Sequence, residues 1–147
     1  MLYFRSDYIG LIKNFLDMKK LLFILIIVLT VLACKKTKYS PEGPTDIRVK
    51  NVSDLPLVMV IVDTSDGIDT LGDISSGGYS EYFRFNKAYP KAEITAKVNG
   101  ELFTTGSVNY NGMTYIGQAK VTYEVYISDI NNKKLTINNC SLDAPLD

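Results

Sequence analysis

Apolar and polar positions alternate along most of the chain after residue 45, in short runs that turn residues separate about every 8–12 positions. The alternation is most regular over residues 120–127, where Val121, Tyr123 and Val125 share one side of the expected strand. One apolar side and one polar side predict a strand that is buried on one face. Residues 57–62 are apolar throughout, which predicts a strand covered on both faces.

A hairpin is expected at the Asn99-Gly100 dipeptide, because Asn-Gly readily adopts the positive φ angles of a tight turn. Apolar residues alternate with polar ones over 94–98 before the turn, and residues 102–103 begin the return strand. Further strands are predicted at residues 47–50, 70–74, 82–85 and 135–137.

Residues 46–142 are therefore expected to form one all-β domain, since no stretch after Cys34 keeps a helical apolar period over three turns. About seven strands in roughly 100 residues are typical of a single antiparallel β-sandwich of the immunoglobulin-like kind. A small closed barrel is the alternative. The polar stretch 109–117 predicts a loop, and residues 143–147 predict a frayed C-terminal tail.

A second pattern precedes the domain. Two lysines follow Met18, residues 21–32 form an apolar run broken only by Thr30, and Ala33 stands before Cys34. The run has 12 residues, a length typical of a signal-peptide core and short of the roughly 20 residues that a permanent membrane span needs. Residues 18–33 are thus expected to be a secretory leader that is cleaved before Cys34.

This arrangement resembles the lipobox of bacterial lipoproteins, although Val31 and Leu32 depart from the usual residues at those places. The resemblance implies that the Cys34 sulfur receives a diacylglycerol and that the new amino group is then acylated. Two or more acyl chains hold a protein firmly on a membrane. The expected partner of this end of the protein is therefore the lipid bilayer, and the polar residues 34–45 form a flexible tether.

Residues 1–17 form an extension upstream of this leader, with apolar residues at helical spacing. One interpretation is an amphipathic helix at the membrane. The other is that translation starts at Met18 and not at Met1, because Met18 alone gives a well-proportioned leader. We favour the second interpretation.

The amino-acid composition excludes several classes of binding partner and catalytic site. Residues 34–147 carry 12 Lys and Arg against 14 Asp and Glu, a net charge of −2, and no basic patch that would favour nucleic acid as a partner. The chain has no His, which excludes Ser-His and Cys-His nucleophile systems and imidazole metal ligands. We therefore expect a protein that is not an enzyme and needs no cofactor. The remaining cysteine, Cys140, is expected to be a small, partly buried side chain.

Two groups of residues are candidate sites. Tyr110 and Tyr115 lie in the expected 109–117 loop, where exposed rings could contact a sugar or a protein partner. The densest acidic stretch offers weak Ca²⁺ candidates, although its spacing does not match an EF-hand loop and Asp is common in turns. These candidates are Asp63, Asp66, Asp69 and Asp73.

The domain itself also resembles small uncharacterised lipoproteins of Gram-negative bacteria. The residues that carry this resemblance are Asn51-Val52-Ser53-Asp54, Leu71-Gly72-Asp73-Ile74, Ser80-Glu81-Tyr82, Ala88-Tyr89 and Val108-Asn109-Tyr110. The resemblance implies a single β domain on a lipid tether and supplies no catalytic residues. In some related bacteria, acidic residues after the lipidated cysteine direct export to the cell surface. Lys35 and Lys36 occupy those places here, which favours a position in the outer membrane facing the periplasm.

The leading hypothesis is a lipid-anchored, non-enzymatic β domain that binds or scaffolds another protein of the cell envelope. The alternative is a module that binds a small ligand or a glycan, with or without Ca²⁺, through Tyr110, Tyr115 or the Asp63–Asp73 stretch.

Overall fold

The computed structural model describes Lys20 and residues 40–146. The chain divides into two compact units, Met1–Lys38 and Tyr39–Asp147. The predicted extension 1–17, the predicted leader apart from Lys20, and the lipid site at Cys34 lie outside the described residues. Within that described part, no helix is long and apolar enough to cross a membrane.

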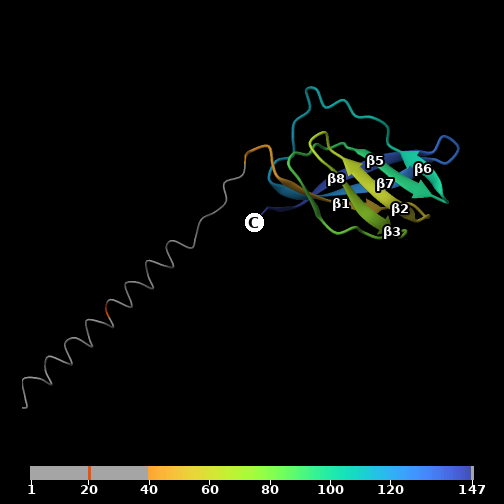
Figure 1. Cartoon of the computed structure of the whole chain (residues 1–147), viewed down its shortest axis with the longest axis horizontal. Coiled ribbons are helices and arrows are strands. Elements are labelled where there is room, and N and C mark those ends of the chain that lie inside the picture. Colours follow the sequence, from red (N-terminus) through yellow and green to blue (C-terminus); the bar gives the residue numbers. More distant parts are fainter. Residues whose placement is uncertain (1–19, 21–39, 147) are drawn as a thin grey trace, which may run out of the picture. The chain divides into compact units, whose positions relative to one another are not determined.

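Residues 40–146 form an all-β domain without helices. Its eight strands are β1 (Thr45–Asn51), β2 (Leu57–Asp63), β3 (Ile68–Ile74), β4 (Phe83–Phe85), β5 (Glu93–Val98), β6 (Glu101–Thr104), β7 (Ala119–Asp129) and β8 (Lys134–Pro145). They belong to one sheet with the order β3-β2-β5-β6-β8-β7-β1-β4 (Figure 1).

This sheet is nearly closed into a barrel. Its two outermost strands, β3 and β4, come into contact, and β3 also approaches β1. The pair β1–β7 is parallel, as is the single-residue pairing of β6 with β8, and the remaining pairs are antiparallel. The expected two-sheet, immunoglobulin-like sandwich is not confirmed. A parallel pair needs a long connection, and residues 52–118 between β1 and β7 provide it.

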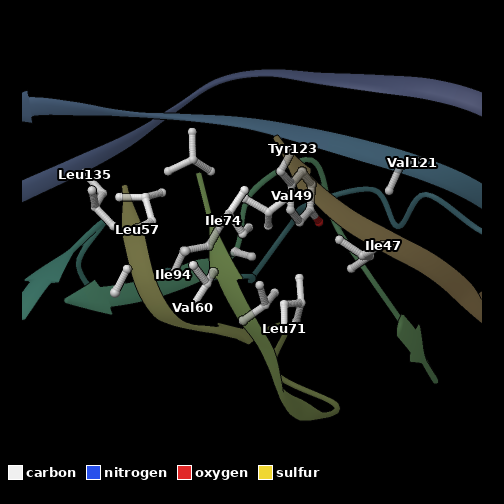
Figure 2. Close-up of a cluster of buried hydrophobic side chains, with 14 of the residues drawn as sticks. Ile47, Val49, Leu57, Val60, Leu71, Ile74, Ile94, Val121, Tyr123 and Leu135 are labelled. Carbon is white, nitrogen blue, oxygen red and sulfur yellow. The ribbon is translucent and has the colours of Figure 1, made fainter. Parts of the chain in front are cut away.

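The core fills the interior of this curved sheet. Figure 2 shows side chains from β2 and β3 below and from β7 and β8 above, pointing toward one another. The largest fully buried side chains are Tyr123, Ile47, Leu57, Ile74, Ile94 and Leu135. They come from six of the eight strands and so join these strands in one core. Burial of each large apolar side chain stabilises the fold by roughly 1.5–3 kcal/mol.

The predicted alternation and hairpin are confirmed. Val121, Tyr123 and Val125 are buried on β7, and on the other face Lys120 and Glu124 are half-buried. Thr122 on that face is the exception, because it is buried where it bonds to Arg48 and Asp143. In the turn between β5 and β6, Asn99 has φ 52° and Gly100 has φ 84°. Both lie in the left-handed region that a tight hairpin turn requires.

The run 57–62 does not form a strand covered on both faces. Val58 is 37% exposed and Met59 is 46% exposed. Met59 has φ 53°, and the pairing of β2 shifts register between residues 57 and 61 against β3 and between residues 58 and 61 against β5. A β-bulge therefore turns these two apolar side chains outward, and the Met59 N–H donates to Asp73 Oδ1 at 2.9 Å.

The structure differs from the predicted tether over residues 40–45, the part of it that is described, and from the predicted tail. Thr45 is fully buried in β1, and the preceding residues 40–44 contact the domain through an ion pair of Glu42 with Lys87 at 2.6 Å. At the other end, β8 continues to Pro145, so residues 143–145 belong to the sheet and not to a frayed tail.

Candidate functional site

Alternation along β1 places Arg48 and Lys50 on the outer face of the sheet, opposite the buried Ile47 and Val49. The parallel register with β7 sets Arg48 beside Thr122 and Lys50 beside Glu124. The Arg48 Nε donates to Thr122 Oγ1 at 2.8 Å, and the Lys50 Nζ donates to Glu124 Oε1 at 3.0 Å. The hydrogen bond to Glu124 is the main reason that the pKa of Lys50 lies above its ordinary value.

Two tyrosines flank Arg48 on this face. The Arg48 guanidinium carbon lies 4.6 Å from the centre of the Tyr79 ring and 4.8 Å from the centre of the Tyr82 ring. Both distances are within the range of a cation–π contact. Tyr79 is brought there by an isolated antiparallel bridge with Lys50, and Tyr82 immediately precedes β4.

Asp143 on β8 completes the arrangement. Its Oδ2 accepts a hydrogen bond from the Tyr82 hydroxyl at 2.7 Å and another from Thr122 Oγ1 at 2.5 Å, and it lies 3.7 Å from Arg48 Nε. Burial, followed by the hydrogen bond to Asp143, raises the pKa of Tyr82. We call Arg48, Tyr79, Tyr82, Thr122 and Asp143 the Arg48 cluster.

The Arg48 cluster holds its long side chains in fixed positions while leaving part of their surface free. Tyr79 remains 51% exposed, and the Arg48 side chain remains 30% exposed. Lys120 adds a further positive charge, with its Nζ 5.9 Å from the centre of the Tyr82 ring. Such a surface offers aromatic area and charge to a binding partner at a low cost in side-chain entropy.

The structure does not bring the two candidate loop tyrosines together. Tyr110 is half-buried: its hydroxyl donates to the Asp63 carbonyl at 3.0 Å, and its ring centre lies 4.8 Å from that of Tyr89. Burial raises the pKa of Tyr110. Tyr110 therefore fastens the 105–118 loop to β2 and is not an exposed platform. Tyr115 is 40% exposed and makes no ring contact with Tyr110 among the described residues.

The acidic residues of the predicted Ca²⁺ stretch serve the backbone individually. Asp63 Oδ1 accepts from the Ser65 N–H at 2.9 Å, Asp69 Oδ1 accepts from its neighbour Thr70 at 2.8 Å, and Asp73 Oδ1 accepts from Met59. Across residues 40–146, no three His, Cys, Asp or Glu side chains form a group that could hold a metal ion. Asp66, the fourth candidate, belongs to no such group among these residues either.

Cys140 is a free, half-buried thiol on β8 that packs against the core. Burial, with a smaller contribution from Asp143, raises its pKa to about 11. The expectation of a small, partly buried side chain is confirmed. At neutral pH, so high a pKa leaves very little of the reactive thiolate.

An open groove lies near the end of β1. It has a volume of about 400 Å³ and is lined by residues 52–55 together with Tyr126, Ile127 and Ile130. Val52 and Ile130 are 39% and 58% exposed, so the groove combines apolar walls with the polar Ser53 and Asp54.

Comparisons with known proteins add little. No family model matches the chain, and no curated protein sequence matches it. A protein from Eubacterium rectale, solved by NMR, aligns with 73% of this chain and 100% of its own length, at 17% identity and a TM-score of 0.48. A likeness of that strength carries no conclusion about function.

The Arg48 cluster was not predicted from the sequence. Its members come from β1, the 79–82 segment, β7 and the end of β8, which lie far apart in the chain. The available signal was the alternation along β1 that turns Arg48 outward, and nothing in the sequence placed Tyr79 and Tyr82 beside it. Asp143 gave no signal, because the polar stretch before it conceals the length of β8.

Proposed function

We propose that this protein is a lipid-anchored, non-enzymatic component of the bacterial cell envelope that binds a protein partner through the Arg48 cluster. The leader pattern that ends at Cys34 supports the anchor, and Lys35 and Lys36 support a place in the outer membrane facing the periplasm. The domain that begins at residue 40 would then extend from the membrane into that space.

The observation that carries the binding proposal is the fixed Arg48 side chain between two tyrosine rings. Arg and Tyr are enriched among the residues that dominate protein–protein binding energy. Side chains that are already ordered lose less entropy when a partner binds, and each such side chain otherwise costs about 0.5–1.5 kcal/mol. The contacts with Thr122 and Asp143 supply this order.

The test is site-specific photo-crosslinking in intact cells. A photoreactive amino acid at position 79, which is 51% exposed, should capture one specific envelope protein. The same amino acid at position 102 on β6 is the matched control, since Leu102 is 60% exposed and β8 and β7 separate β6 from β1 in the sheet. Arg48→Ala should abolish the specific product while the fold is retained.

If positions 79 and 102 capture the same set of abundant porins and lipids, this proposed function is wrong. The same conclusion follows if Arg48→Ala leaves the specific product of position 79 unchanged, because that side chain is the centre of the proposed surface.

The alternative function, binding of a small ligand or a glycan, is favoured by the groove beside Tyr126. Aromatic rings and a few polar groups in a concave site are typical of small-ligand binding. A glycan array that is probed with and without Ca²⁺ separates the two functions. Binding that Tyr126→Ala removes and Arg48→Ala leaves intact would favour the groove.

A further inference from the structure

The long strand β8 has a free edge over most of its length. It pairs with β7 along its whole course, from Lys134 to Pro145. On its other side β6 pairs with it at one position, Thr104 with Lys134, supported by the Thr104 N–H donating to the Lys133 carbonyl at 3.1 Å. No backbone hydrogen bond between described residues joins residues 136–144 to any element except β7.

The direction of the free backbone groups follows from the neighbouring pairs. The Val125 carbonyl accepts a hydrogen bond from the Val52 N–H, so the backbone N–H and C=O of Val125 point toward β1. Because these groups alternate along a strand, those of Thr122 and Glu124 point toward β8. The β8 partners of those two residues are Ser141 and Asn139. The residues between and beyond them, Cys140 and Leu142, therefore direct their N–H and C=O groups away from β7.

The side chains at this edge are also incompletely covered. Leu142 pairs with the buried Val121 and so lies on the core side of the sheet, yet it is 69% exposed. Ile137 and Cys140, on the same side, are only half-buried. Next to unpaired backbone groups, this apolar margin is the surface that an added strand would cover.

The other long edge of the sheet differs in its protection. β3 carries Asp69 and Asp73 and a left-handed Gly72 with φ 83°. Charges and irregular backbone at an edge discourage the addition of a strand. The regular stretch 139–142 of β8, between register shifts on either side, contains no charged residue.

We propose that two copies of this chain pair antiparallel through the free edges of their β8 strands. The occupant is a second copy because residues 139–142 are self-complementary. A two-fold axis at Cys140 or at Ser141 places the apolar Cys140 opposite Cys140 or Leu142 of the other copy. No like charges face each other, and each chain satisfies the free groups of its partner with the same strand.

Light scattering on the full chain in mild detergent tests the proposal. The expected result is a protein mass of two chains for the wild type. Leu142→Lys, at a side chain that is 69% exposed, should raise the dimer dissociation constant at least about tenfold, because lysine on an edge strand opposes pairing. Ile68→Lys, equally exposed on β3, should leave the dimer intact.

A second measurement locates the interface. Either two-fold axis places Leu142 opposite Asn138 or Cys140 of the other copy. A photoreactive amino acid at position 142 should therefore join two copies, with the crosslink mapped by mass spectrometry to residues 138–140, whereas the same amino acid at position 68 should not. A wild type that stays monomeric up to its solubility limit overturns the proposal. So does a dimer that Leu142→Lys leaves unchanged, or crosslinking from position 142 to residues outside β8.

Discussion

Tyr123→Phe tests how the core holds two loops, the segment with Tyr89 between β4 and β5 and the 105–118 loop with Tyr110. The Tyr123 side chain is fully buried, and its hydroxyl donates to the Tyr89 carbonyl. The Tyr89 ring in turn contacts Tyr110, whose hydroxyl donates to the Asp63 carbonyl. Loss of the Tyr123 hydroxyl removes a hydrogen bond worth about 1 kcal/mol and leaves the carbonyl of the half-buried Tyr89 without this partner, for a total cost of about 1–3 kcal/mol.

The free energy of unfolding from urea denaturation, followed by circular dichroism, measures this cost. A loss of about 2 kcal/mol corresponds to a melting temperature lower by roughly 8–12 °C in a domain of this size. The matched control is Tyr126→Phe on the same strand, because the Tyr126 hydroxyl makes no hydrogen bond among the described residues; it should change stability by less than about 0.5 kcal/mol. Equal stability of Tyr123→Phe and the wild type, or equal losses in both variants, would refute the reasoning.

Two further predictions concern the backbone and the thiol. Gly43→Ala should destabilise the domain more than Gly72→Ala. A Cβ at Gly43 would lie 2.0 Å from the Asn86 carbonyl oxygen, whereas one at Gly72 meets nothing within 4 Å and adds only the backbone strain of its φ of 83°. Urea denaturation of both variants checks this order, and a smaller loss for Gly43→Ala would contradict it. The fold raises the pKa of the Cys140 thiol to about 11 and so favours its neutral form. The neutral thiol should therefore contribute fully to the free energy of unfolding below about pH 9, and this contribution should be lost as the pH rises toward 11. Ultraviolet titration of the thiolate should give a midpoint near 11 in the wild type, and denaturation at each pH should show that Cys140→Ser lacks this loss; a midpoint near the ordinary thiol value would contradict the prediction.

The strands that were predicted well are those with one buried face and regular pairing. The period of two over residues 120–127 and the turn chemistry at Asn99-Gly100 are local signals, and the structure keeps both. The predictions of burial and of strand ends were wrong where the alternation of buried and exposed residues is interrupted. In β2 the bulge at Met59 turns apolar residues outward, and in β8 register shifts between residues 137 and 144 place polar residues inside a long strand.

The topology and the Arg48 cluster depend on contacts between distant segments. The residues of β1 do not by themselves predict that this strand pairs in parallel with β7, because that pairing depends on the packing of the whole core. Arg48 and Asp143 meet only after β1, β7 and β8 are in register. The loop position of Tyr110 predicted an exposed ring, but its bulk is used to fasten the loop to Asp63.

Intact mass spectrometry of the protein purified from its native membrane is the most direct test of the proposed anchor. A polypeptide that begins at Cys34 and carries acyl chains is the result that the proposal requires, together with incorporation of a palmitate analogue that Cys34→Ser abolishes. An unmodified Cys34, or a leader still attached to it, would contradict the proposal.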